Sequence, residues 1–348
     1  MPKREAQGLP ELDALRRLID RLGEFDELAR VKLLAREESE RLPIYGVTLG
    51  ARDPEAPAML FVGGVHGVER IGTEVVLAFL DQIVERLAWD EGLHHELKRY
   101  RLAFLPLVNP GGMKARTRAN PAGVDLMRNA PRHPEAQPAF LVGGQRLSPR
   151  LPWYAGRDAK EGFCQPESRA LKAFAEETLS SSRRAISLDC HSGFGMIDRL
   201  WFPYARTRRP FSGLAEMMRL EELLDRTLPN HIYRVEQVAR SYTIDGDLWD
   251  HLYDAFRAEK QPGDGIFLPL TLEMGSWIWV RKNPRQIFDP LGGFNPLVRH
   301  RLERTLRRHL LLFDFLTRVT MSDRALEFSS ESERASYEER GYKHYFVR

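Results

Sequence analysis

The stretch Gly63-Gly64-Val65-His66-Gly67-Val68-Glu69 follows an apolar run, residues 59–62, which predicts a buried strand. Glycines on both sides of the histidine suit a tight turn from a strand into a helix. Such a turn can place side chains three positions apart on one side of the backbone, so that His66 and Glu69 could reach a single ion. The carboxyl end of a strand is also where open α/β sheets usually bind their ligands. Taken alone, a His-x-x-Glu pair more often consists of two unrelated surface groups.

A candidate third ligand lies far downstream, in Asp189-Cys190-His191-Ser192 at the end of a second apolar run. Two imidazoles and one carboxylate form the ligand set of an open, catalytic zinc site, whose fourth position stays free for water or substrate. His191 could instead be a hydrogen-bonded histidine of the core. On a strand, Asp189 and His191 share a face, so Asp189 could hydrogen-bond the ligand imidazole, or it could cap a loop.

Two further features bear charged side chains that such a site would need. Glu273 lies in the apolar segment Leu270-Thr271-Leu272-Glu273-Met274-Gly275, where a carboxylate is costly unless it has a partner or a task. A general base beside a metal-activated water would be such a task; an edge position that faces solvent is the alternative.

Residues 116–129 form a predicted loop that is rich in arginine. Arginine is suited to binding a carboxylate and to stabilising an oxyanion. Alternatively, these basic side chains could simply lie in solvent.

Composition restricts the class of protein. The chain has 348 residues, of which 43% are hydrophobic, and its longest apolar stretches are too short and too interrupted to span a bilayer. A net charge of +3 argues against nucleic-acid binding as the main task. The first residues lead into a charged helix rather than an apolar signal core, so we expect a cytoplasmic protein with no membrane partner. In that compartment Cys164 and Cys190 are expected to remain thiols.

Apolar periodicity predicts strands that alternate with helices, which favours an α/β fold with a mixed, mostly parallel sheet and helices on both faces. Residues 111–166 are irregular, and such long connections usually shape a site or are disordered. Beyond residue 322 the chain is charged, and we expect an extended tail. The predicted helices are 10–29, 72–87, 166–179, 214–228, 246–256 and 295–319, and the predicted strands are 31–36, 42–49, 59–62, 100–108, 185–190 and 267–274.

Taken in order, these segments resemble the zinc carboxypeptidase family, the carboxypeptidase A-like metallopeptidases. The resemblance implies a single-domain catalytic fold over residues 40–322, an N-terminal helix and lead-in strand over residues 1–39, and a tail over residues 323–348. No propeptide is expected ahead of the catalytic segments. The matching segments are Gly63–Glu69, Asn109-Pro110-Gly111-Gly112, residues 118–129, Cys190-His191-Ser192, Tyr242 with Gly246, and Leu270–Glu273.

The resemblance also implies roles for single residues. His66, Glu69 and His191 look like the ligands of one zinc ion per chain, and Glu273 looks like the general base that takes a proton from water and returns it to the leaving amine. The hydrolytic residues of the family are therefore all present.

Substrate contacts are implied in the same way. Arg128, with its neighbour Asn129, matches the segment that holds the substrate carboxylate. Arg118 or Arg116 would polarise the scissile carbonyl and hold the oxyanion. Tyr242 looks like the mobile tyrosine that covers the bound substrate.

One departure bears on specificity. The family usually has Asn-Arg where this chain has Met127-Arg128, and the missing amide removes a donor to the terminal carboxylate. Arg128 alone could still bind a carboxylate in a bidentate manner. The leading interpretation is a zinc-dependent hydrolase that removes a terminal residue from a peptide. A deacylase of small N-acyl amino acids, like the succinylglutamate desuccinylase and aspartoacylase relatives, and a catalytically inactive binding protein remain as alternatives.

Overall fold

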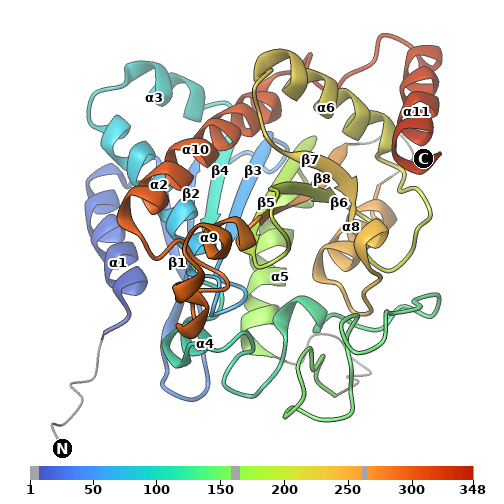
Figure 1. The fold of residues 1–348 in the computed structure, drawn as a ribbon. Helices are drawn as coiled ribbons and strands as arrows, with labels where there is room; N and C mark the ends of the chain where they lie inside the picture. The colour runs from blue at the N-terminus through green and yellow to red at the C-terminus, as the bar shows by residue number, and fades with distance from the viewer. Residues whose placement is uncertain (1–7, 158–164, 261–264, 348) are drawn as a thin grey trace, which may run out of the picture.

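The computed structural model describes residues 8–157, 165–260 and 265–347. Within these residues, eight strands form one sheet in the order β1-β2-β4-β3-β5-β8-β6-β7 (Figure 1). The strands are β1 (Ala29–Arg36), β2 (Pro43–Gly50), β3 (Ala58–Gly63), β4 (Arg101–Leu105), β5 (Arg184–Ser192), β6 (Arg199–Phe202), β7 (Arg234–Gln237) and β8 (Ile266–Met274).

The centre of the sheet is parallel and its flanks are mixed. β4, β3, β5 and β8 run parallel to one another, while β1 pairs with β2 and β2 with β4 in antiparallel fashion. On the other flank, β6 runs antiparallel to β8 and β7 runs parallel to β6. The carboxyl ends of β3, β5 and β8 therefore meet at one edge of the sheet. This arrangement confirms the predicted mixed, mostly parallel sheet.

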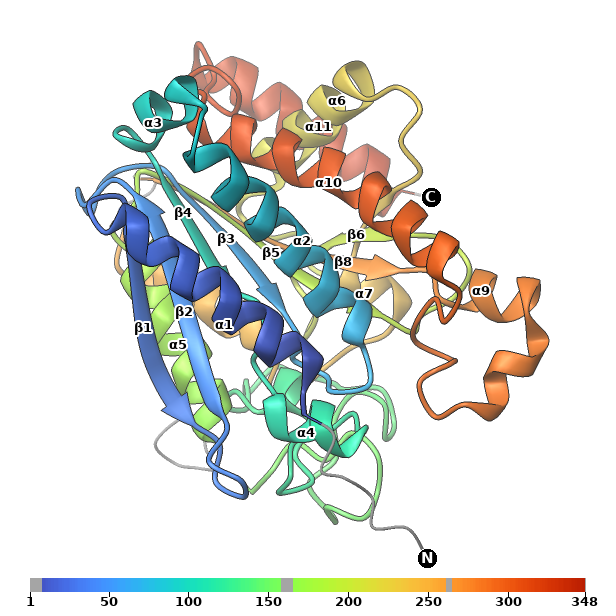
Figure 2. The same cartoon turned by 90° about the vertical axis from the view of Figure 1, so that its left-hand side faces the viewer.

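Helices cover both faces of the sheet, as Figure 2 shows, with α1, α2 and α10 together on one side and α5 on the other. α8 packs on β8 and against α5. The helices are α1 (Pro10–Leu22), α2 (Arg70–Leu87), α3 (Glu91–Leu97), α4 (Pro110–Ala115), α5 (Pro166–Leu179), α6 (Leu214–Thr227), α7 (Val238–Ser241), α8 (Leu248–Ala258), α9 (Trp277–Lys282), α10 (Arg299–Met321) and α11 (Glu331–Phe346).

A cluster of phenylalanines anchors the central strand. The Phe61 ring of β3 stacks on Phe313 of α10 at 4.5 Å between centroids and lies 5.1 Å from Phe79 of α2. Phe104 of the neighbouring β4 also stacks on the Phe61 ring, at 5.5 Å between centroids. Such aromatic contacts add to the stabilisation from burial alone. They hold β3, and hence the turn that carries His66, against both the helices and the next strand.

Several expectations need correction. The tail beyond residue 322 is not extended: it contains α11, which packs against α6. The first helix was predicted to run to residue 29, but it ends at Leu22. Residue 29 is instead the first residue of β1. The irregular region 111–166 contains the short helix α4 and a 3₁₀ turn, and β6 and β7 were not predicted.

Other expectations stay open. β1 pairs with β2 across the predicted domain boundary at residue 39, and the domain division itself remains a prediction. Cys190 is buried and free, whereas Cys164 lies outside the described residues. None of the described helices is both long and apolar enough to cross a bilayer.

Candidate active site

The turn after β3 brings His66 and Glu69 to the edge where β5 ends. In the register of the parallel pair, Gly63 lies opposite Cys190, so His191 emerges beside the turn. Glycine is required within this turn, because a Cβ on Gly67 would lie 2.1 Å from the carbonyl carbon of Gly112 in α4. The sequence feature that predicted a tight turn therefore corresponds to a close approach of two backbones.

The three side chains form a donor set that fits a zinc ion. Their ligand atoms all lie within 4.8 Å of one another. His66 Nδ1 is 3.1 Å from His191 Nδ1 and 3.2 Å from Glu69 Oε1, and His191 Nδ1 is 3.0 Å from Glu69 Oε2. Ligand atoms at about 2.1 Å from a tetrahedral zinc would lie about 3.4 Å apart, close to these separations. The residues present thus fit the metal that the donor chemistry implies.

Neighbouring carboxylates orient the two imidazoles through their other nitrogens. His66 Nε2 lies 3.0 Å from Asp125 Oδ1, and His191 Nε2 lies 2.9 Å from Asp189 Oδ2. Trp249 in turn donates to Asp189 Oδ2 at 2.8 Å. Such carboxylate–histidine pairs direct the opposite nitrogen toward a metal and raise its basicity. Asp189 lies beside the His191 imidazole, as one of the two alternatives considered from the strand periodicity expected. Asp125 was not singled out from the sequence.

The charges of the site strongly perturb its titration. Burial opposes ionisation of Glu69, but the adjacent His66 and His191 hold the pKa of Glu69 well below its usual value. Burial opposes protonation of His191, but Asp189 and Glu69 raise the pKa of His191 well above its usual value. Since metal ligands must be deprotonated, a metal bound by these groups would compete with protons.

Glu273 lies beside the ligand set because β8 is the parallel neighbour of β5. Glu273 pairs in register with His191 and is 8% exposed, so it does not face solvent from an edge. The backbone N–H of Phe194 donates to Glu273 Oε1 at 3.1 Å. Burial raises the pKa of Glu273 to about 8, and the negative charge of Glu69 adds to this effect.

Two arginines, Arg116 and Arg118, were candidates for stabilising the oxyanion, and only Arg118 lies beside the candidate metal ligands. Its guanidinium donates to Glu69 Oε1 at 2.9 Å and to Asp125 Oδ2 at 3.0 Å. Arg116 ends α4 with a positive φ of 57°, is exposed, and lines a different depression beside Leu9. The backbone therefore separates the two side chains, which the sequence alone did not distinguish.

A cavity of about 490 Å³ opens above the donor set. Tyr242 lines it, with its ring 5.9 Å from that of Phe194 and 6.2 Å from that of Trp201. Asp247 also lines the cavity, in addition to Glu69 and Glu273, and burial raises the pKa of Asp247 to about 6. The remaining wall is largely apolar and includes Met127, Val142, Pro152, Trp153, Val238, Ile244 and Phe294.

Comparison with known proteins identifies the family. A family model described as zinc carboxypeptidase matches residues 24–276. The chain belongs to the zinc carboxypeptidase family. Carboxypeptidase SOL1 of Arabidopsis thaliana is 25% identical over 190 residues, which cover 46% of this chain and 38% of that protein. Carboxypeptidase D of Drosophila melanogaster is 33% identical over 93 residues, 24% of this chain and 7% of that protein, so the chain spans well under half of each relative.

Solved structures show that this member of the zinc carboxypeptidase family shares the family's fold. Thrombin-activatable fibrinolysis inhibitor superposes with a TM-score of 0.67 at 18% identity, covering 90% of this chain and 74% of that one. Carboxypeptidase A from Helicoverpa armigera gives a TM-score of 0.57 at 18% identity, over 85% of this chain and 71% of that one. The family match gives no support to the N-acyl amino acid deacylase considered from sequence.

The two residues expected to hold the substrate carboxylate differ in placement. Arg128 is only 1% exposed, although it lines the cavity, and it donates to Asp125 Oδ2 at 2.9 Å and to the Val142 carbonyl at 2.8 and 3.0 Å. Asn129 does not line the cavity. Its side chain instead donates to the Ala155 carbonyl and accepts from the Gln165 N–H, which ties together parts of the long loop.

Proposed function

We propose that this protein is a zinc-dependent hydrolase that removes the terminal residue of a peptide bearing a free carboxylate. The observation that carries the proposal is the donor set of His66, Glu69 and His191 at the base of a 490 Å³ cavity, with Glu273 and Arg118 beside it. The family match supports the metallopeptidase class, and the residues at the site support this chemistry within it.

Each proposed role follows from position and charge. Zinc held by His66, Glu69 and His191 would act as a Lewis acid that acidifies water and polarises a carbonyl. Glu273 takes the proton of the attacking water and returns it to the leaving amine nitrogen, for which a pKa near neutrality is suited. Arg118, held by Asp125, stabilises the negative charge that develops on the carbonyl oxygen.

Substrate selection is proposed to depend on other residues that line the cavity, namely Arg128, Met127 and Asp247. Arg128 has N–H groups left over after its bonds to Asp125 and Val142, since a guanidinium carries five donors. Arg128 and Met127 line the same cavity, and together they would receive the carboxylate and the apolar side chain of the terminal residue. Asp247 would repel a substrate with an acidic terminal side chain.

A substrate panel with defined metal content tests this function. Zinc-loaded protein is incubated with N-blocked tripeptides that end in a free carboxylate, with their amidated counterparts, and with N-acyl amino acids. We expect release of the terminal residue from the free-acid peptides, loss of this activity on chelation, and its return with zinc. His66→Ala should lose most of its zinc and activity together.

Three outcomes would overturn the proposal. Cleavage of N-acyl amino acids but not of peptides would favour the deacylase. Bound zinc with no turnover of either class would favour an inactive binding protein. Full zinc occupancy in His66→Ala would refute the assigned ligand set.

A further inference from the structure

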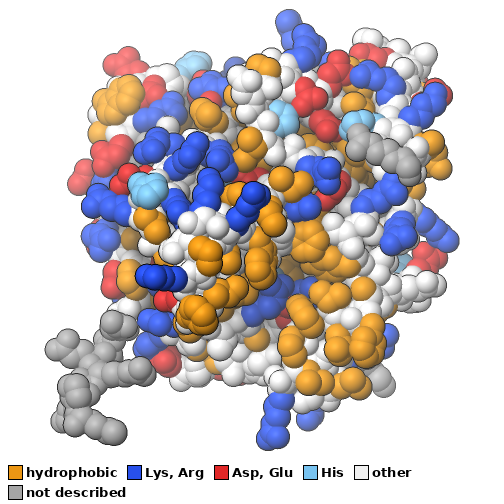
Figure 3. Space-filling model, in the orientation of Figure 1, with side chains coloured by type: hydrophobic (Ala, Val, Ile, Leu, Met, Phe, Trp, Pro, Cys, Tyr) orange, Lys and Arg blue, Asp and Glu red, His pale blue; other side chains and the backbone are white. Residues whose placement is uncertain are grey.

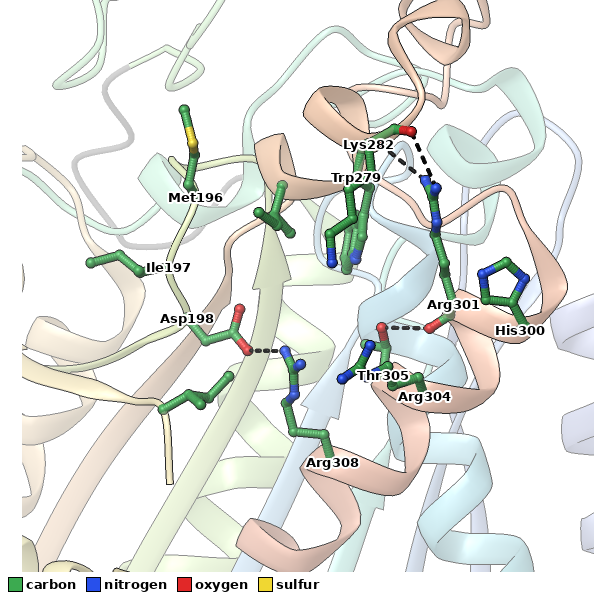
Figure 4. Close-up of a pocket in the computed structure, with 12 residues that line it drawn as sticks. Met196, Ile197, Asp198, Trp279, Lys282, His300, Arg301, Arg304, Thr305 and Arg308 are labelled. Atoms are coloured by element: carbon green, nitrogen blue, oxygen red, sulfur yellow. Dashed lines mark hydrogen bonds and ion pairs between the residues drawn. The ribbon is translucent and has the colours of Figure 1, made fainter. Parts of the chain in front are cut away.

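A second pocket, of about 370 Å³, lies between the loop after β5 and the N-terminal half of α10 (Figure 4). Met196, Ile197 and Asp198 form its side on the loop, and α9 and α10 form the other side. Gly193 and Phe194 of the same loop line the active-site cavity instead, and no described residue lines both pockets. The second pocket is therefore a separate site on the other side of one loop.

Positive charge is concentrated in this pocket. Among the described residues, its walls carry four permanently basic side chains, namely Lys282, Arg301, Arg304 and Arg308, and one carboxylate, Asp198. The pocket therefore carries a net positive charge as large as that of the whole chain, +3. Figure 3 shows Lys and Arg side chains gathered over the part of the surface formed by α9 and α10.

Two of these cations have no partner to neutralise them. The side chains of Lys282 and Arg304 are exposed, and their charged groups make no hydrogen bond or ion pair with any residue in the described part of the chain. Arg301 donates to the backbone carbonyls of Trp279 and Lys282, each at 3.3 Å, which positions its guanidinium without neutralising it. Arg308 alone has an acidic partner, Asp198, at 3.3 Å (Figure 4).

The pocket also has an apolar side. Met196 is 53% exposed, Ile197 41% and Ile232 43%, and all three line it together with Ile278 and Trp279. A bare inorganic ion would leave this apolar surface in water, whereas a ligand with an apolar part would bury it.

We propose that this pocket binds a small organic phosphate, whose dianionic group is held by Lys282 and Arg304 and whose apolar part packs on Met196, Ile197 and Ile232. Arginine and lysine are the usual phosphate-binding side chains, and two unpaired cations suit a dianion. The concave shape favours a small molecule over an extended polyanion.

Calorimetric titration of the full chain with phenyl phosphate, at fixed ionic strength, tests the proposal. The double variant Lys282→Glu/Arg304→Glu reverses the two free cations of the pocket. The matched control, Arg281→Glu/Arg307→Glu, makes the same charge change at exposed positions of the same two helices that do not line the pocket. Inorganic phosphate and phenol serve as probes of the anionic and apolar parts alone.

We expect the pocket variant to bind phenyl phosphate about tenfold or more weakly, because charge-assisted hydrogen bonds are lost. The control variant should stay within about threefold of the parent, since its side chains do not line the pocket and solvent-exposed charges are screened by salt. Inorganic phosphate and phenol should each bind the parent more weakly than phenyl phosphate does. Absence of phenyl phosphate binding by the parent, equal losses in the two double variants, or equal affinity for inorganic phosphate would each overturn the proposal. Both variants keep the active-site cavity intact, so peptide hydrolysis is tested independently.

Discussion

A single carboxylate, Asp125, links most of the charged groups of the site. It contacts His66 through Oδ1 and accepts from Arg118 and Arg128 through Oδ2. Burial opposes its ionisation, but Arg128 and Arg118 hold the pKa of Asp125 well below its usual value. Asp125 is buried and contacts three side chains that are positively charged or polarised, so it fixes their positions relative to one another. Loss of one partner would leave the buried negative charge of Asp125 less well compensated. The orientation of the proposed zinc ligand and that of both arginines are therefore coupled.

Glu273→Gln should keep zinc and substrate binding but lower kcat by roughly 10²- to 10⁴-fold, the usual contribution of general acid–base catalysis. The amide preserves the shape and removes the basicity of the side chain. Steady-state kinetics together with metal analysis of the same preparation check this. Turnover within about threefold of the parent, far inside that scale, would rule out the proposed base.

Met127→Asn should raise kcat/KM for free-acid peptides by roughly threefold to tenfold, because it places a second donor beside Arg128 at the cavity wall. Amidated peptides lack the carboxylate and should not gain. Met127→Leu, which keeps the apolar character, is the matched control and should show neither change. Equal gains on free-acid and amidated substrates would show that the amide acts on something other than the carboxylate.

Residue spacing singled out three candidate ligands that the structure brings together, and their role as ligands stays a prediction. Spacing could not show which of the two arginines lies at the site. His66 and Glu69 follow β3 and His191 lies near the end of β5, and both strands are visible as apolar runs in the sequence. That these two strands are neighbours in the sheet is not visible there. Arg116 and Arg118 differ only in the backbone at the end of α4, where the positive φ of Arg116 directs it away. That Arg128 is already bonded to Asp125 and Val142 depends on a loop fold with no periodic signal.

At the scale of elements, most long strands and helices with clear apolar periodicity were predicted within a few residues, and short or charged ones were not. The first helix is an exception, since it was predicted to run to residue 29 and ends at Leu22. β6 and β7 have four residues each, too few for an alternation to be seen. α11 is strongly charged, and only Gly341 and Tyr345 along it are buried, so its sequence resembles a solvated tail. The helix α11 packs against α6, and such contacts between distant segments cannot be predicted from the sequence pattern of α11 alone.

α11 provides a stability prediction with an internal control. Tyr345 is 6% exposed, its ring lies 4.8 Å from that of Phe202, and its hydroxyl donates to Glu221 of α6. Tyr345→Ala should lower the free energy of unfolding by about 2–4 kcal/mol, the cost of truncating a buried aromatic. Tyr342→Ala, at a half-exposed position of the same helix, should cost about 0.5 kcal/mol or less. Similar urea midpoints for the two variants would show that α11 does not stabilise the fold.

At the scale of the whole molecule, the proposed metal site joins the two halves of the sheet's parallel centre. His66 and Glu69 follow β3, which packs against α2, α10 and α5, while His191 lies near the end of β5, which pairs with both β3 and β8. A metal that binds only the folded arrangement of these segments stabilises the whole fold by mass action. The stabilisation must also depend on pH, because the same nitrogen atoms bind either the metal or a proton.

Zinc should therefore raise the melting temperature, and the rise should shrink as the pH falls. Asp189 and Glu69 raise the pKa of His191, so protons compete for His191 more strongly at low pH, and zinc affinity falls in that direction. At free zinc of about 100 times Kd the expected stabilisation is about 2.7 kcal/mol. Scanning calorimetry with and without zinc at about pH 8 and about pH 6, on either side of neutrality, measures it. His191→Ala should abolish the rise, whereas His95→Ala, an exposed histidine of α3, should preserve it. A zinc-dependent rise of the same size in His191→Ala would place the stabilising metal elsewhere.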